Sequence, residues 1–227
     1  MRAKRAFLSL LMLAPLSAHP TAHLLNGAFF SLGMGVGEGR LVTDRILNTT
    51  HNFSTNSVFL GMQGKLGEQN YFTPLIGVGY YGYFSYRYLY MDQWAKTTSK
   101  ANNIDRYQVG VGANLLLNFY SKIVKTKSKH AKIRTFGMFG GLLAVANIWT
   151  LYFNNNTPYI RNNANIDAVF GLHMRFNRIK ISLGVHVPIA NETKYIKLPA
   201  GNQQFSMFEI VNNYKSSELF LNFTHLF

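Results

Sequence analysis

The feature that most constrains the fold is an alternation of apolar and polar residues with a period of two. In residues 179–189 every odd position is aliphatic, and every even position is small, polar, charged or proline. Residues 106–119 and 166–176 repeat the pattern, and weaker copies lie near residues 29–37, 57–63, 76–81 and 218–227. Because successive side chains of a strand point to opposite faces, each segment predicts a strand with one apolar and one polar face.

Eight strands are expected in this way, and the chain is long enough for a single domain. Their predicted ranges are 28–38, 54–66, 71–86, 104–119, 132–147, 164–177, 179–189 and 216–227. The strand at 132–147 is apolar on both faces, so the alternation leaves its facing open. With 48% apolar and only 14% charged residues, the composition excludes disorder as the main state.

The connections between the predicted strands alternate in length. Long polar loops are expected near 39–53, 87–103, 148–163 and 190–215, whereas tight turns are expected at 67–70 and 177–178. The connection 120–131 is longer, although it falls at the end of the barrel where short turns are expected. Long loops alternating with short turns are typical of outer-membrane β-barrels, whose long loops are extracellular.

The first 18 residues resemble a secretory signal peptide. Arg2, Lys4 and Arg5 precede an 11-residue apolar run that is too short to span a bilayer, and small residues follow it. We expect cleavage near Ala18, with Ala22 as the alternative site. An ordinary buried first helix is the competing interpretation.

No later apolar run approaches the roughly 20 residues of a transmembrane helix, so any membrane crossing must use strands. Aromatic residues cluster at both ends of the predicted strands, as in the girdles of membrane barrels. The expected inner girdle is Tyr71, Phe72, Phe119, Tyr120, Phe176 and Phe227, and the expected outer girdle is Tyr83, Phe84, Tyr86, Tyr88, Tyr90, Tyr107, Trp149 and Tyr152.

The predicted fold is therefore all-β: a transmembrane, antiparallel, up-and-down β-barrel of about eight strands, formed by residues 19–227, with both termini periplasmic. A soluble β-sandwich is the alternative. It leaves the signal segment and the terminal phenylalanine unexplained.

Four segments resemble the Helicobacter outer membrane protein family: Asn26–Gly33, Val36–Gly39, Gly184–Pro188 and Phe208–Phe227. The resemblance implies an outer-membrane barrel, and for larger relatives adhesion or pore formation. The long extracellular domain of the adhesive members is missing here. The resemblance also implies that the outer-membrane assembly machinery reads Phe227 together with Phe223 and His225, although most relatives have Tyr at the position of His225.

Polar residues on the predicted inner faces form the first candidate site. We expect a lumenal polar network of Arg106, Asp167, His173, Arg175, Lys180 and His186, because buried charges persist by pairing. A metal site at His173 and His186 is the alternative, disfavoured by the scarcity of acidic partners. No cofactor is expected. The glycines from Gly33 to Gly39 do not have phosphate-loop spacing and are expected to allow close packing inside a narrow barrel.

A run of basic residues forms the second candidate site. Lys122, Lys125, Lys127, Lys129 and Lys132 fall in the turn expected in the periplasm, where they would meet anionic headgroups or the cell-wall polymer, or simply solvent. In the extracellular loops, lipopolysaccharide phosphates are the expected partners of Arg40, Arg45, Lys96, Lys100, Arg161, Lys194 and Lys197. Nucleic acid is excluded as a partner despite the net charge of +14, because secretion separates the chain from it.

Two functions remain open at this stage. The first is a structural or surface-interaction protein of the outer membrane whose lumen is plugged by inward side chains such as Phe29, Phe59, Tyr81 and Tyr83; its surface or host ligand stays unidentified. The second is a narrow, weakly anion-selective porin. A lipid-modifying outer-membrane enzyme is a weaker third alternative, because no G-x-S-x-G motif and no Ser/His/acid grouping is present, and we expect no enzymatic activity.

Overall fold

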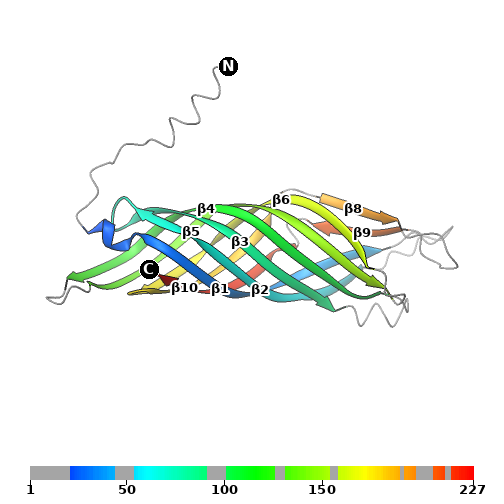
Figure 1. The fold of residues 1–227 in the computed structure, drawn as a ribbon, viewed down its shortest axis with the longest axis horizontal. Helices are drawn as coiled ribbons and strands as arrows, with labels where there is room; N and C mark the ends of the chain where they lie inside the picture. Colours follow the sequence, from blue (N-terminus) through cyan, green and yellow to red (C-terminus); the bar gives the residue numbers. More distant parts are fainter. Residues whose placement is uncertain are drawn as a thin grey trace, which may run out of the picture.

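Eight strands of the computed structural model close into a ring (Figure 1). The structure describes residues 21–43, 54–90, 101–125, 131–153, 158–189, 192–197, 207–212 and 216–227. The ring strands are β1 (Gly27–Thr43), β2 (Ser54–Tyr71), β3 (Ile76–Tyr90), β4 (Ala101–Lys125), β5 (Ala131–Phe153), β6 (Tyr159–Phe176), β7 (Ile179–Pro188) and β10 (Glu218–Leu226). Each pairs antiparallel with the next, and β10 pairs with β1 to complete the barrel.

Two further strands extend the sheet beyond the ring. β8 (Glu192–Lys197) pairs with β9 (Met207–Asn212), and β9 pairs with the last residues of β1, where Leu41 opposes Ile210. β10 begins only at Glu218, opposite Gly37, so β1 continues past its partner and its free edge is paired by β9. The segment 190–215, expected as a loop, therefore contains a hairpin.

The two chain termini of the described part and the short turns lie at the same end of the barrel (Figure 1). We call this the turn end, and the opposite end, where β8 and β9 lie, the loop end. Before β1, a short 3-10 helix, η1 (Ala22–Leu25), lies at the turn end. Among the described residues, no helix is long and apolar enough to cross a bilayer.

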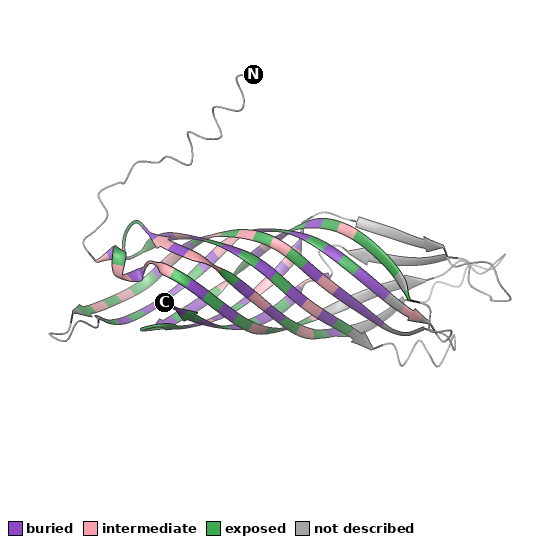
Figure 2. Cartoon of the chain, in the orientation of Figure 1, coloured by how far each residue is buried: buried purple, intermediate pink, exposed green. Residues whose placement is uncertain are grey.

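Burial alternates along every ring strand, as the striped colouring in Figure 2 shows. In β10 the pattern is strict: residues 218, 220, 222, 224 and 226 are buried, and the residues between them are exposed. In β5 the odd residues from Ile133 to Trp149 are buried, except for the half-buried Gly141, which resolves the facing of the strand that is apolar on both sides. Apolar side chains thus cover the outer wall, and mostly polar and aromatic side chains fill the inside.

Several strands run further than the sequence indicated. The expected turn at 67–70 belongs to β2, and the chain turns at 72–75 instead, where the Thr73 hydroxyl accepts hydrogen bonds from the backbone N–H groups of Leu75 and Ile76. The polar residue Gln69 resembles a turn residue in composition, but its side chain points inward and bonds to a backbone carbonyl of η1. At the loop end, β3 continues to Tyr90 and β5 to Phe153, inside the expected loops.

The tight turn at 177–178 is confirmed. Asn177 has a φ of 55°, the left-handed conformation that asparagine tolerates better than most residues. Its backbone N–H donates to the carbonyl of Ile133, and its side-chain oxygen accepts from the N–H of Ile133. The β6–β7 hairpin is thereby attached to the start of β5.

Three residues assigned to the aromatic girdles were misplaced. Tyr71, Tyr83 and Trp149 are buried inside the barrel, because the phase of the strand alternation overrides the preference of aromatic residues for the membrane interface. Exposed aromatic side chains do lie on the outer wall toward the turn end, including Phe72, Phe119, Tyr120, Phe176 and Phe227, and Phe84 and Tyr88 lie toward the loop end.

Candidate functional site in the barrel lumen

The centre of the loop-end lumen is a carboxylate shared by two arginines. The Arg87 Nε donates to Glu218 Oε2 at 2.9 Å, and Arg106 Nη2 forms an ion pair with Glu218 Oε1. These residues come from β3, β4 and β10, and all three side chains are buried. We refer to Arg87, Arg106 and Glu218 as the Glu218 cluster. It connects strands on opposite sides of the ring, since β10 is separated from β3 by β1 and β2.

Arg87 is bonded on every nitrogen. Besides Glu218, its guanidinium donates to the Met62 carbonyl at 2.8 Å, to the Tyr86 carbonyl at 3.3 Å and to Gln63 Oε1 at 2.8 Å. Gln63 Nε2 in turn donates to Asn222 Oδ1 at 2.8 Å. A buried guanidinium with this many partners has a fixed position, so the cluster forms a rigid cross-brace in the lumen.

Arg106 lies between two aromatic rings. Its guanidinium carbon is 5.2 Å from the ring centre of Phe59 and 5.2 Å from that of Trp149. The two rings meet edge to face at 6.1 Å. Aromatic faces stabilise a desolvated cation, and their bulk fills the lumen on the loop side of the cluster.

Glycines of β1 provide the space that the Glu218 cluster occupies. A Cβ atom on Gly35 would lie 2.4 Å from Arg87 Nη2, and one on Gly37 would lie 2.5 Å from Glu218 Cγ. The inner face of β1 is therefore backbone only at this level. The glycine repeat allows this close approach of neighbouring side chains, which is the packing role that its period of two indicated.

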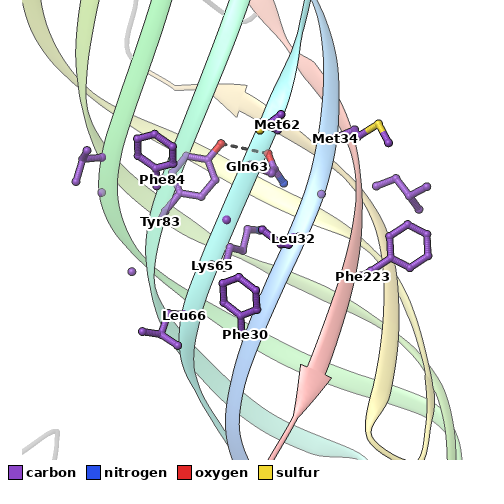
Figure 3. Close-up of a pocket in the computed structure, with 16 residues that line it drawn as sticks. Phe30, Leu32, Met34, Met62, Gln63, Lys65, Leu66, Tyr83, Phe84 and Phe223 are labelled. Atoms are coloured by element: carbon purple, nitrogen blue, oxygen red, sulfur yellow. Dashed lines mark hydrogen bonds between the residues drawn. The ribbon is translucent and has the colours of Figure 1, made fainter.

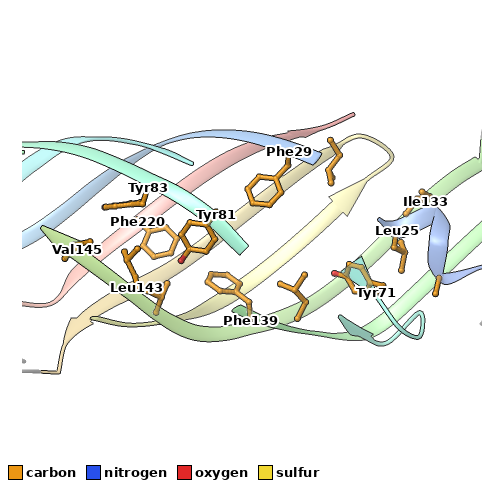
Figure 4. Packing of buried hydrophobic residues seen from close by; sticks show 14 residues of the cluster. Leu25, Phe29, Tyr71, Tyr81, Tyr83, Ile133, Phe139, Leu143, Val145 and Phe220 are labelled. Carbon is orange, nitrogen blue, oxygen red and sulfur yellow. The ribbon is translucent and has the colours of Figure 1, made fainter. Parts of the chain in front are cut away.

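The middle of the lumen is filled mainly by rings and aliphatic groups (Figure 4). Phe29, Tyr81, Phe139 and Phe220 belong to one buried cluster with Leu143. Of the four side chains predicted to plug the lumen, Phe29, Phe59, Tyr81 and Tyr83 are each at most 7% exposed. Eight strands leave an interior that side chains can just fill, and here they do so largely with aromatic groups.

The turn end is capped by η1. Leu25 is fully buried and packs in the apolar cluster that also contains Tyr71 (Figure 4). Its carbonyl accepts hydrogen bonds from Gln69 Nε2 at 2.7 Å and from Arg175 Nη1 at 2.8 Å. Lys180 Nζ donates to Gln69 Oε1 at 2.7 Å. The segment that precedes β1 thus closes the lumen at this end.

All six residues of the predicted lumenal network are buried in the barrel, but the structure does not bring them together as one network. Arg106 pairs with Glu218, while Asp167 accepts from Asn165 Nδ2 at 2.9 Å. The other four are distributed along the lumen: His173 bonds to Asn118, Arg175 to the carbonyls of Leu25 and Asn177, Lys180 to Gln69, and His186 packs against Phe220 and Tyr83.

The residues that organise the loop-end lumen were missed by the sequence analysis. Glu218 is in phase with Phe220 and Asn222 on β10, and Arg87 is in phase with Tyr83 and Ser85 on β3, so strand parity would have placed both inside. Arg87 fell within the expected loop 87–103 because β3 was predicted to end at residue 86. Lys65 was also missed, although it lies within the predicted strand 54–66 and follows Gln63 by two positions.

The other predicted sites lie at the turn end. Phe223, His225 and Phe227 are exposed on the outer wall of β10, where the His225 and Phe227 rings are 5.1 Å apart, and His225 pairs with Phe30 of β1. Of the basic run, Lys122 and Lys125 end β4 and Lys132 begins β5. Lys127 and Lys129 lie outside the described residues.

For the loop cations, only the Arg161 side chain is described, and it is exposed. Arg45, Lys96 and Lys100 lie outside the described residues; Arg40, Lys194 and Lys197 belong to strands, but their side chains are not described. In the described part of the chain, no group of three or more His, Asp or Glu side chains could hold a metal ion.

A groove of about 790 Å³ opens on the outer wall across β1, β2 and β3 (Figure 3). Met34, Met62 and Phe84 line it on the outward side. Gly64 and Gly82, which carry no side chain, also line it. Its lining is that of a hydrocarbon-facing surface, and the groove is separate from the Glu218 cluster.

The closed ring, the apolar outer wall bordered by aromatic residues and the polar interior define a transmembrane β-barrel of the outer-membrane type. The sequence model of the family described as "Helicobacter outer membrane protein" matches residues 63–226. The chain therefore belongs to this family, and it is an outer-membrane protein. In such barrels the short turns are periplasmic, so the turn end is the periplasmic end and the loop end the extracellular one.

Three solved structures are similar to the chain at low identity. Neisserial surface protein A (NspA) is 10% identical with a TM-score of 0.44, covering 88% of this chain and 99% of its own. OprG from Pseudomonas aeruginosa is 10% identical with a TM-score of 0.49, covering 88% and 96%. Ail of Yersinia pestis, solved with the heparin analogue sucrose octasulfate, is 11% identical with a TM-score of 0.39, covering 88% and 99%. No curated protein matches the sequence significantly.

Proposed function

We propose that the protein is an integral outer-membrane barrel with a structural or surface-interaction role and a lumen closed by its own side chains. The observation that carries this proposal is the Glu218 cluster, which crosses the lumen with three buried side chains, both arginines being bonded to Glu218. The stacking of Arg106 between Phe59 and Trp149 and the η1 cap at the other end add to the closure. With the lumen filled, contact with the surroundings falls to the outer wall and the loops.

The proposed partners follow from position and charge. Outer-membrane lipid contacts the outer wall, and lipopolysaccharide phosphates are the proposed partners of basic loop residues such as Arg161. The assembly machinery is proposed to read the C-terminal strand through Phe227. The exposed basic residue Lys122 lies two positions from the exposed aromatic residue Tyr120 on β4, and exposed Lys132 pairs with Val124 nearer the turn. Basic and aromatic side chains together suit the interface of the periplasmic leaflet. Neither a catalytic activity nor a cofactor is part of the proposal.

The proposal includes secretion with removal of residues 1–18. Cleavage after Ala18 keeps η1, whose residues Ala22 and Leu25 are fully buried at the periplasmic end. Cleavage after Ala22 would remove the first of these buried residues. We therefore favour Ala18 as the cleavage site, and N-terminal sequencing of the mature protein from outer membranes tests the choice.

Conductance separates this role from the porin alternative. We expect the refolded mature protein to give no discrete current steps in a planar bilayer, because no continuous path passes the Glu218 cluster. Heat-modifiable gel mobility is the control for folding. The matched variant replaces Arg87, Arg106 and Glu218 together by Ala, which empties the brace without leaving an unpaired charge. Because the aromatic cluster and η1 still fill the rest of the lumen, we expect this variant to stay silent as well. Reproducible anion-preferring steps from the folded wild-type protein would instead establish a small porin.

A further inference from the structure

A small cavity lies inside the barrel between the Glu218 cluster and the η1 cap. It measures about 40 Å³ and is bordered by the rings of Phe29, Tyr81 and Phe139, which converge there in Figure 4. The polar groups in its wall are Ser31, Lys65, Asn114, His173, Lys180, Ser182, Asn222 and Thr224. One water molecule needs about 10–15 Å³ of such volume, so this space accommodates a small ion with its contacts.

Two lysines from different strands reach this cavity, and neither has a carboxylate partner among the described residues. Lys65 is 7% exposed, and no carboxylate forms an ion pair with it in the described part of the chain. Its ammonium contacts ring faces instead, 4.6 Å from the centre of Phe220 and 4.9 Å from that of Tyr81. Lys180 has one acceptor, Gln69 Oε1. Two uncompensated ammonium groups in a low-dielectric space are costly unless one lysine is neutral or an anion joins them.

The neutral groups in the wall are arranged as donors toward the cavity. Gln63 Nε2 donates to Asn222 Oδ1, which leaves the Asn222 NH₂ to donate elsewhere. The Thr224 hydroxyl donates to Ser31 Oγ at 2.9 Å, so the Ser31 proton also needs an acceptor. The oxygen of Asn114 is used in the same way, by the Tyr81 hydroxyl. The Asn222 NH₂ and the Ser31 hydroxyl are therefore two neutral donors in the cavity wall.

We propose that this cavity is a binding site for one small monovalent anion of chloride size, held between Lys65 and Lys180. A cation is excluded by the two ammonium groups and the lack of a carboxylate in the cavity wall. The anion neutralises one of the two charges and accepts from Ser31 and Asn222, so its role is structural: it completes the polar interior that the side chains leave cationic.

Bromide is the probe for this site, because it replaces chloride and scatters anomalously. Crystals of the wild-type barrel grown in sodium bromide should show an anomalous peak in the cavity between the two ammonium groups. In lipid vesicles at fixed ionic strength, the urea midpoint should be higher in sodium chloride than in sodium gluconate, whose anion is too large to enter. Lys65→Met should weaken the chloride dependence at least about tenfold, because a hydrogen bond to a charged group contributes that much affinity.

Lys122→Met is the matched control, since this lysine is exposed at the periplasmic end, and its chloride dependence should equal that of the wild type. A wild-type crystal without a bromide peak would overturn the proposal even if the Lys65 variant failed to fold. Equal midpoints in chloride and gluconate would overturn it as well. The bromide peak and the chloride dependence of the urea midpoint do not depend on whether the barrel conducts. The anion site can therefore be tested whether or not the lumen proves to be closed.

Discussion

Replacing Glu218 by Ala should lower the free energy of unfolding by about 3–5 kcal/mol, the range seen when one partner of a buried ion pair is removed. Glu218 is the only carboxylate bonded to Arg87 and Arg106 among the described residues, so its removal leaves two buried guanidinium groups facing each other. The measurement is urea unfolding of the refolded protein in lipid vesicles, followed by heat-modifiable mobility.

Three variants separate charge from packing in this experiment. Glu218→Gln keeps the side-chain volume and one acceptor but loses the charge, so most of the cost should remain. Changing Arg87, Arg106 and Glu218 together to Met should restore much of the stability, since replacing a whole buried ionic group by apolar residues is often neutral. Glu68→Gln, on the outer wall where Tyr80 bonds to it, is the control and should cost at most about 1 kcal/mol. An equal, small effect at Glu68 and Glu218 would show that the Glu218 cluster does not brace the barrel.

Gly33→Val should prevent stable closure of the barrel. A Cβ on Gly33 would lie 2.4 Å from the Leu221 carbonyl oxygen and 1.9 Å from Asn222 Oδ1, so the added side chain would push β1 away from β10 at the closing seam. Overpacking of a tight interior costs about 1–3 kcal/mol and more where backbone must move. We expect at least about 3 kcal/mol here, measured by urea unfolding, with a reduced yield of the heat-modifiable form.

Gly140→Ala is the matched control for this prediction. An added Cβ there has no atom within 4 Å, so the variant should change stability by at most about 0.5 kcal/mol. If Gly33→Val refolded with the yield and stability of the Gly140 variant, β1 would not be packed against β10 as the structure places it. Asn222→Ala in the Gly33→Val background should recover only part of the loss, because the contact with the Leu221 backbone remains.

The fold could be predicted from the sequence because its signal is local. Side-chain facing has a period of two in a strand, so residues such as Val185 and His186 reveal their opposite faces without knowledge of any partner. The same alternation also sets the facing of the aromatic residues, but the girdles were predicted from residue type instead. Tyr83 and Trp149 were assigned to a girdle as aromatic residues, although their phase places them inside.

The pairings inside the lumen could not be predicted in this way. Arg87 and Glu218 are 131 residues apart, and Gln63 and Asn222 are 159 apart. Such contacts join strands that are not direct neighbours, so they depend on the tilt and register of several strands at once. Asp167 was the carboxylate in the predicted network that contained Arg106, whereas the carboxylate that reaches Arg106 belongs to Glu218, on the strand that closes the ring.

The most direct test of the closed lumen is the reactivity of single cysteines, for which the cysteine-free chain is well suited. Ser85 is fully buried beside the Glu218 cluster, and its hydroxyl donates to Gln108 at 2.7 Å. Ser85→Cys changes its size little, and Asn162→Cys provides an exposed control at the extracellular end. With a small charged methanethiosulfonate reagent, Cys at 162 should be labelled in the folded protein, and Cys at 85 only after unfolding. Labelling of both at the same rate in the folded barrel would contradict a lumen closed by its own side chains.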